Sequence, residues 1–151
     1  MIVGLDTTVI VAVAITSHPR HSACRSLMER IRADGDIVAV TPAVLAEFIH
    51  VVTDQRRFAP ALDMDTARNV AVSLWETEET CRVVTDGSAV TQFSNWMAEF
   101  RLGRNRVLDT MLAATYFQSG ITTILTLNPA DFSVFGVFQC LTPTDPNEVP
   151  T

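Results

Sequence analysis

The chain begins with the sequence MIVGLDTT at positions 1–8, in which a short apolar run is followed by an aspartate and two threonines. A run this short and β-prone predicts a buried strand of a parallel sheet rather than a helix. Ligands of open α/β sheets bind beyond the carboxyl ends of the strands, so Asp6 occupies a position suited to chemistry. The alternative is that Asp6 or Thr7 only caps the helix that follows.

The length of 151 residues predicts one domain with a substantial core. We expect this domain to span residues 1–142, and residues 143–151, which are rich in proline and polar side chains, to form a flexible tail. The longest uninterrupted apolar run, 9–15, is too short to cross a bilayer, and no basic segment precedes it as in a secretory signal. We therefore expect a cytoplasmic protein with no membrane contact.

The cysteines, histidines and basic residues limit the class of site. The three cysteines and three histidines lack the spacing of a zinc site and favour a reducing compartment. The net charge of −6 speaks against a nucleic-acid partner, but all 11 basic residues are arginines, which bind phosphate through a bidentate fork. Arg104 and Arg106, just before Asp109, are therefore candidates for phosphate contact. The alternative is a solvated charged loop.

Short apolar runs alternate along the chain with segments of helical spacing. Strands are expected near 2–5, 37–40, 81–84, 122–126 and 137–141, and helices near 8–14, 21–33, 42–52, 63–79, 89–100 and 106–118. This alternation predicts an α/β fold in which a central parallel sheet lies between two layers of helices. Right-handed crossovers would bring the carboxyl ends of the strands to one edge of the sheet.

Four acidic side chains occupy positions from which that edge can be reached. Asp6 follows the first strand, and Glu47 lies early in the helix after the second. Asp109 lies early in the helix before the fourth strand, and Asp131 follows that strand. Each has a simpler explanation: Glu47 as a surface acid beside an apolar stripe, Asp109 as a complement to the helix dipole, and Asp131 as a turn cap. An accidental placement of all four acids at one edge is less expected than any one of these explanations taken alone.

Clustered carboxylates repel one another and require protons or a cation between them. Ligand sets made only of oxygen favour Mg²⁺ or Mn²⁺ over zinc. Such an ion neutralises phosphate oxygens, lowers the pKa of a bound water and orients in-line attack. The four acids therefore predict the hydrolysis of a phosphodiester.

Four stretches of the sequence are similar, in this order and over nearly the whole chain, to the PIN-domain proteins of the VapC toxin family. This family is the ribonuclease half of bacterial toxin–antitoxin pairs. The stretches are LDT at 5–7, LAEF at 45–48, VLDTMLAAT at 107–115 and LTLNPADF at 125–132. The resemblance implies a PIN-like fold and an endoribonuclease that depends on Mg²⁺, with Mn²⁺ as a substitute.

The resemblance also assigns residues to the metal site. It implies that Asp6, Glu47 and Asp109 bind the ion. Many members of the family carry the fourth acid near the start of the closing loop, where this chain has Asn128. Asp131 is the remaining acid of that loop, and it either takes the fourth place or assists Asn128 there.

Two threonines next to Asp6 are expected to support the metal site. Thr8 stands where many members of the family have asparagine or serine, and its hydroxyl can still orient Asp6 or a water. Thr7 is the second supporting residue. Arg104 and Arg106 become candidates for RNA contact in this reading.

The resemblance further implies an RNA substrate, a homodimer and inhibition by a small cognate antitoxin protein. The apolar helices between 41 and 61, and the segment before Gly35, offer surface for a dimer. One alternative is a PIN-like fold that has lost catalysis and serves as a protein-binding module. Phosphoacceptor domains need a lysine that this chain lacks, and dehalogenase-type phosphatases need D-x-D where Thr8 stands.

Overall fold

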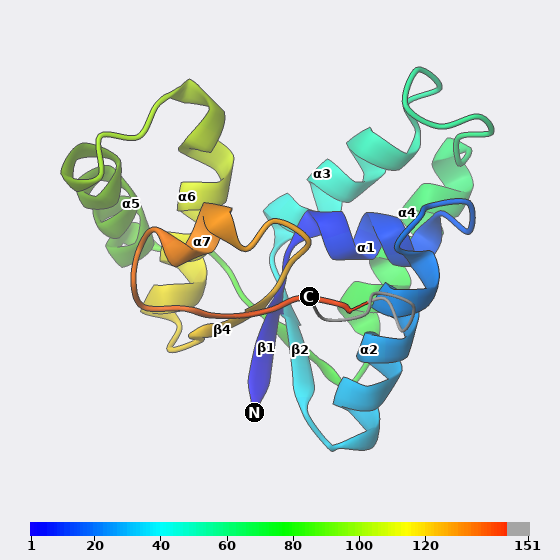
Figure 1. Cartoon of the computed structure of the whole chain (residues 1–151), viewed down its shortest axis with the longest axis horizontal. Helices are drawn as coiled ribbons and strands as arrows, with labels where there is room; N and C mark the ends of the chain where they lie inside the picture. The colour runs from blue at the N-terminus through cyan, green and yellow to red at the C-terminus, as the bar shows by residue number, and fades with distance from the viewer. Residues whose placement is uncertain (145–151) are drawn as a thin grey trace, which may run out of the picture.

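Five strands form a parallel sheet in the order β3-β2-β1-β4-β5 at the centre of the structure, a computed structural model that describes residues 1–144 (Figure 1). The strands are β1 (Ile2–Leu5), β2 (Ile37–Val40), β3 (Thr80–Arg82), β4 (Thr123–Leu125) and β5 (Gln139–Leu141). The bounds expected for β1 and β2 are confirmed. Strands β4 and β5 are shorter than expected, and β3 is shorter and begins one residue earlier than expected. Residues 145–151, most of the predicted tail, lie outside the described residues.

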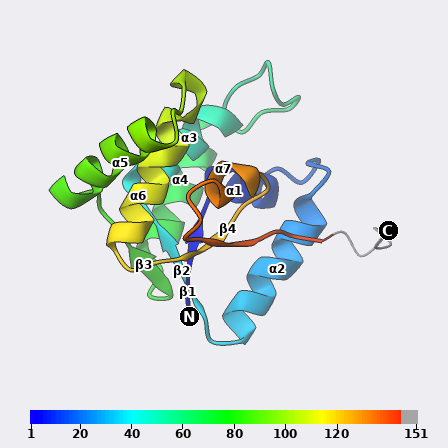
Figure 2. The ribbon, with the colours of Figure 1, turned by 60° about the vertical axis from the view of Figure 1, so that its left-hand side comes forward.

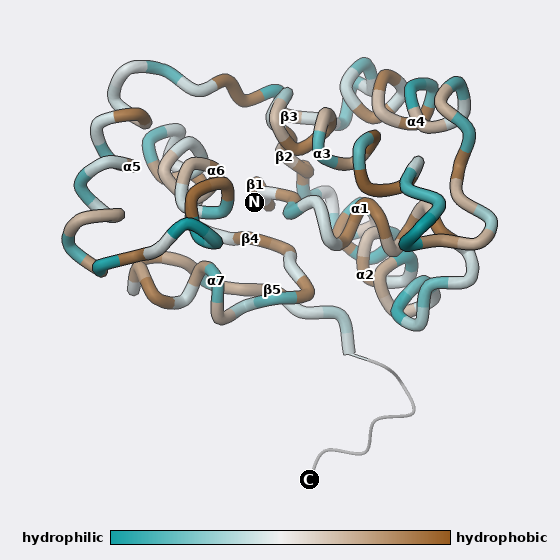
Figure 3. Tube along the Cα trace, turned by 90° about the horizontal axis from the view of Figure 1, so that it is seen from above, coloured by the Kyte–Doolittle hydropathy of each residue, from teal (hydrophilic) through white to brown (hydrophobic). Residues whose placement is uncertain are grey.

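Helices cover both faces of the sheet, and the predicted three-layer α/β/α architecture is confirmed. One face carries α1 (Thr7–Ala14), α2 (His21–Ala33), α3 (Pro42–Val52) and α4 (Met64–Glu76). The other carries α5 (Gly87–Glu99), α6 (Val107–Gln118) and α7 (Ala130–Ser133), with the 3-10 turn η1 (Arg104–Arg106) before α6. Figure 2 shows α5 and α6 side by side, and Figure 3 shows the sheet between the two layers from above.

The direction in which strands are added to the sheet reverses between β1 and β4. The chain first places β2 and β3 on one side of β1, and then crosses to β4 and β5 on the other side. Leu5 pairs in register with Leu125, so the next residues, Asp6 and Thr126, leave the sheet together at its carboxyl edge. Such a reversal is the place where open α/β sheets bind ligands.

Local sequence fixes where several helices begin and end. The Thr41 hydroxyl caps α3 by accepting a backbone N–H at 3.2 Å, and Asp63 caps α4 in the same way at 2.8 Å. Helix α4 ends at Glu76, earlier than the expected residue 79, because Thr77 is extended and begins the turn into β3.

Among the residues that the structure describes, no helix has the length and apolar character needed to cross a membrane.

Tyr116 of α6 fixes the end of β1. This side chain is fully buried, and its hydroxyl lies 2.7 Å from the Leu5 carbonyl oxygen and 3.0 Å from that of Ala39. A Cβ at Gly4 would lie 2.8 Å from the tyrosine ring, so glycine is required for this close approach. The contact ties β1 to β2 just before the chain reaches Asp6.

Candidate active site

Asp6 lies directly beyond β1 and is almost fully buried, with 5% of its surface exposed. It occupies the N-cap position of α1, but its side chain makes no capping hydrogen bond within the described chain. The carboxylate oxygen Oδ2 instead accepts hydrogen bonds from the hydroxyls of Thr8 and Thr126, each at 2.7 Å. Simple helix capping therefore does not explain Asp6, whose side chain is held by two threonines from different elements.

Thr126 was not among the predicted site residues, and it joins Asp6 to the closing loop. Its side chain is fully buried, and its hydroxyl oxygen also accepts the backbone N–H of Asn128 at 2.9 Å. The Thr8 hydroxyl likewise accepts the N–H of Leu127 at 3.2 Å. The sequence did contain a signal for Thr126: this polar residue directly follows β4, just as Asp6 directly follows β1. Only the strand order makes these two positions neighbours.

Burial raises the pKa of Asp6 above its ordinary value, although the hydrogen bonds from Thr8 and Thr126 lower it. The charge of Asp131 adds to the upward shift. Placing a carboxylate out of water disfavours its charged form unless a partner compensates. Burial therefore disfavours the charged form of Asp6, and a cation bound beside this carboxyl would offset that effect.

Asp109 lies in the first turn of α6, as predicted, and its environment is acidic. Burial, followed by the charges of Asp6, Asp131 and Glu47, raises its pKa to about 6, against a smaller opposite effect of Arg106. The fold therefore brings the four predicted acids within electrostatic range of one another. A helix-dipole role alone does not account for a carboxyl whose charged form is disfavoured.

Glu47 is positioned by the first residue of α1. The hydroxyl of Thr7 donates to Glu47 Oε2 at 2.9 Å, which links α3 to the segment that carries Asp6. Glu47 and Asp109 line a small cavity of about 110 Å³ between α3 and α6. Glu47 also lines a second cavity together with Asn128. Glu47 thus lines both of these cavities, which lie at the carboxyl edge of the sheet.

The structure places Asp131 in the short helix α7 rather than in a plain loop. Its carboxylate lies 3.7 Å from Arg106 Nη1, and Arg106 also donates to the Asp131 backbone carbonyl. Arg106 is therefore engaged by the acidic site itself. Arg104, two residues earlier in η1, is exposed. The proposed RNA contacts of both arginines stay predictions.

The donor chemistry of the acids fits Mg²⁺, although they do not form a finished cage. Within residues 1–144, no three Asp, Glu, His or Cys side chains are placed to hold one ion together. Magnesium commonly takes one or two carboxylates and keeps several waters, so such a cage is not required. A cation would also relieve the repulsion that raises the pKa of Asp109. The assignment of the four acids as ligands stays a prediction.

A family model and solved structures place this geometry among known folds. The model of the PIN domain family matches residues 3–136. No curated protein matches the chain. The fold is similar to that of VapC20 from Mycobacterium tuberculosis, described as a toxin that cleaves the sarcin–ricin loop. The identity is 18%, the TM-score is 0.62, and the match covers 82% of this chain and 87% of that one.

Two further similar structures are toxin–antitoxin complexes. A chain of VapBC2 from Rickettsia felis, bound to a DNA fragment from its promoter, has 17% identity and a TM-score of 0.67, covering 94% of this chain and 98% of that one. A chain of VapBC-1 from nontypeable Haemophilus influenzae has 16% identity and a TM-score of 0.68, covering 96% and 100%. At these identities the likeness concerns the fold.

Proposed function

Because the chain belongs to the PIN domain family, we propose that it is a metal-dependent endoribonuclease and the toxin of a toxin–antitoxin pair. The observation that carries this proposal is the raised pKa of Asp109, to which Asp6, Glu47 and Asp131 all contribute from different elements. Carboxyls that crowd one another at the reversal of an open sheet support a functional site, because perturbed pKa values and ligands both concentrate at such positions.

The side chains of the site have distinct roles in this mechanism. Both threonine hydroxyls donate to Oδ2 of Asp6 and hold its carboxylate, which would be one of the groups that bind the ion. Thr7 holds Glu47 in place through its 2.9 Å hydrogen bond. Mg²⁺, when bound, would neutralise the phosphate and lower the pKa of the attacking water. The water would then displace the ribose 3′-oxygen and leave a 5′-phosphate and a 3′-hydroxyl.

Asp109 and Asp131 complete the charge of the site. The pKa of Asp109 is about 6 without a cation, since burial and the surrounding acids disfavour its charged form, and a bound ion would favour that form. Arg106 bonds the Asp131 backbone carbonyl and faces its carboxylate, which keeps α7 beside the acids. Arg104 is exposed, so its guanidinium is accessible to the phosphate backbone of RNA.

The substrate is proposed to be RNA that is single-stranded or looped, because its phosphates can reach a recessed acidic site. The similarity to a toxin described as cleaving the sarcin–ricin loop supports an RNA substrate. Mg²⁺ is the proposed cofactor, with Mn²⁺ as a substitute. The oxygen-only donor set supports both ions.

The proposed partners are a cognate antitoxin and a second copy of the chain. The similar VapBC structures, each a toxin with its antitoxin, support the first. An apolar cavity of about 460 Å³ between α1, α2 and α4, with Val9, Met28 and Leu74 in its lining, is the surface proposed for an apolar segment of the antitoxin. Exposed Val72, beside Trp75 on α4, is proposed to contribute to a homodimer.

A protein-binding module without catalysis is the second candidate. One observation favours it: within the described residues, the acids are not arranged as a finished metal cage. Calorimetric titration with Mg²⁺ and Mn²⁺, followed by incubation with single-stranded RNA, separates the two. Metal binding together with RNA cleavage supports the nuclease. Absence of both, in a folded protein, supports the binding module.

A further inference from the structure

A cavity of about 360 Å³ opens beside the acidic site, between the start of α1, the end of α3 and the closing loop. Thr8 and Glu47 line it on the acidic side. Three side chains that the proposed mechanism does not use, His18, Arg57 and Phe58, line it elsewhere. Its volume is within the range of small-molecule clefts, roughly 300–1,000 Å³. The cavity is therefore large enough for one nucleotide next to the metal site.

Phe58 provides an aromatic wall in this cavity. The residue is half-buried, and its backbone N–H donates to the Asp54 carbonyl oxygen at 3.1 Å, which fixes the turn that follows α3. Aromatic side chains next to nucleic-acid sites bind unpaired bases by stacking. Phe58 is partly exposed and lines the cavity together with Glu47, so it is in a position to offer its ring to a base.

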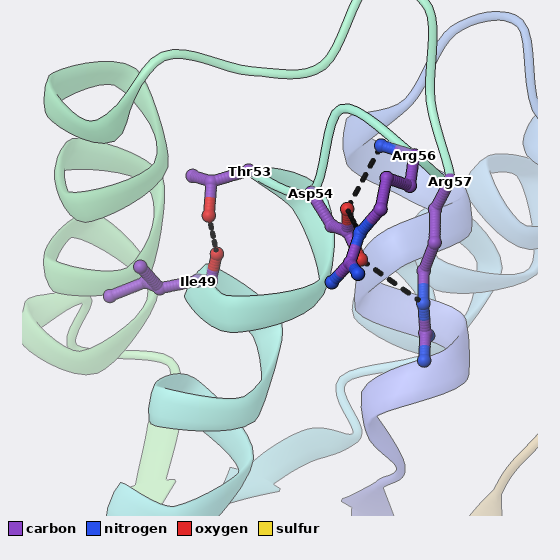
Figure 4. Close-up of polar contacts among 5 residues, drawn as sticks. All are labelled: Ile49, Thr53, Asp54, Arg56 and Arg57. Atoms are coloured by element: carbon purple, nitrogen blue, oxygen red, sulfur yellow. Dashed lines mark hydrogen bonds and ion pairs between the residues drawn. The ribbon is translucent and has the colours of Figure 1, made fainter.

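Arg57 provides a cation in the same wall. Its Nε lies 3.8 Å from Asp54 Oδ2, while Asp54 Oδ1 accepts the Arg56 backbone N–H at 2.9 Å (Figure 4). These bonds, chiefly that from the Arg56 backbone, lower the pKa of Asp54 and keep it charged. The Arg57 side chain is still 62% exposed, so its guanidinium is available to a phosphate. Arg56 does not line the cavity.

His18 provides a hydrogen-bond donor, and its contacts indicate which ring nitrogen carries the proton. The backbone N–H of Arg20 donates to His18 Nδ1 at 3.0 Å, so a neutral ring carries its proton on Nε2. Burial, and then the charges of Arg20 and His21, lower the pKa of His18 and favour the neutral form. Asn128, also in the lining, adds an amide with both donor and acceptor atoms.

We propose that this cavity binds the nucleotide next to the scissile phosphate of a single-stranded RNA. The base stacks on Phe58, its edge meets His18 and Asn128, and the adjoining phosphate contacts Arg57. This inference rests on the proposed function and adds to it the determinant of base preference. The lining combines Val11, Val51, Leu127 and the Phe58 ring with a cation, an imidazole and an amide. This mixture of apolar and polar groups suits a nucleotide, which has an apolar base face and polar edges, better than it suits an apolar peptide.

The cavity is tested by binding, independently of cleavage. Uridine, cytidine, adenosine and guanosine 5′-monophosphates are titrated into the full chain with Mg²⁺, and NMR signals of Phe58 and His18 are followed. We expect saturable shifts with at least one nucleotide. Phe58→Leu should weaken binding by about 5- to 100-fold, as loss of base stacking does, and Phe58→Trp should retain it. Circular dichroism verifies that each variant is folded.

The two neighbouring arginines give a matched pair of variants. Arg57→Ala should weaken nucleotide binding about 5-fold or more, since it removes a phosphate contact. Arg56→Ala removes a guanidinium that pairs with the same aspartate but does not line the cavity, so this variant should bind as the wild type does. Equal binding by the wild type, Phe58→Leu and Arg57→Ala overturns the proposal. So does the absence of saturable shifts, which is the result expected of a cavity that takes protein side chains.

Cleavage of a random-sequence RNA separates this proposal from the function on which it rests. The proposal is supported if the wild type prefers a particular base next to the cut and Phe58→Leu changes that preference. Cleavage with the same preference in both overturns the cavity and leaves the nuclease intact. Nucleotide binding by a wild type that cuts no RNA overturns the nuclease and leaves the cavity as a nucleotide site.

Discussion

Thr126 donates its hydroxyl proton to Asp6 across 2.7 Å, which joins the residues that directly follow β4 and β1. These two strands are in register at Leu5 and Leu125, where the strand order reverses. The hydrogen bond is fully buried, and it competes with the desolvation that raises the pKa of Asp6. Thr126 is therefore a positioning residue of the proposed metal site.

Replacing Thr126 by valine tests this role. Thr126→Val keeps the side-chain shape but leaves the buried Asp6 carboxylate with one hydroxyl fewer, so we expect a loss of about 1–3 kcal/mol in the free energy of unfolding without metal. RNA cleavage should fall about 10-fold or more, since a charged group is less well fixed. Thr126→Ser should restore both quantities in urea unfolding and cleavage assays. Unchanged cleavage by Thr126→Val would remove this residue from the site.

Protonation of Asp109 predicts a pH dependence of stability. Its pKa, about 6 in the fold against 3.8 as an ordinary value, means that the folded chain binds its proton more tightly than the unfolded chain. The stability that this proton contributes is therefore fully present below pH about 3.8 and is lost as the pH rises from there through about 6. Asp109→Asn should be more stable than the wild type at pH 7.5 by about 1–2 kcal/mol, a figure reduced for partial exposure. Urea unfolding at pH 5 and 7.5 measures the difference, and equal pH profiles would contradict it.

Metal binding should stabilise the fold. Mg²⁺ or Mn²⁺ should raise the Tm of the wild type because the ion relieves carboxylate repulsion in the folded chain. At a concentration 100 times the Kd, the free energy of unfolding should increase by about 2.7 kcal/mol. Asp6→Asn should lose most of this increase. Glu29→Gln, which changes an exposed acid paired with Arg25 on α2, is the control and should keep it. A Tm that neither ion changes in the wild type would argue against a metal site.

The fourth group of the site can be identified by two variants. Asp131 contributes to the raised pKa values of both Asp6 and Asp109, so Asp131→Asn should weaken Mg²⁺ binding about 10-fold. Asn128→Ala should change Mg²⁺ binding less, since Asn128 meets the network through its backbone N–H. Calorimetric titration measures both. The reverse order would assign the fourth place to Asn128.

The sequence predicted β1 and β2 with their bounds because each is a short apolar run followed by a residue at the N-cap of the next helix. Residues 2–5 and 37–40 are strands as expected, and Thr41 caps α3. Periodicity also placed the four acids at one edge, and the structure brings them within electrostatic range. It could not supply Thr126 or the Arg106–Asp131 pair. Both contacts join distant segments and depend on strand order and on side-chain packing, which local patterns do not encode.

The central claim is that the acids at the carboxyl edge cleave RNA with the help of a metal ion. The most direct measurement is the rate at which purified wild type and Asp6→Asn cut a labelled single-stranded RNA with Mg²⁺. We predict metal-dependent cleavage by the wild type, a loss of about 100-fold or more in Asp6→Asn, and a folded variant by circular dichroism, since its two threonine partners can still bond the amide. Cleavage by Asp6→Asn at the wild-type rate would contradict the proposed mechanism.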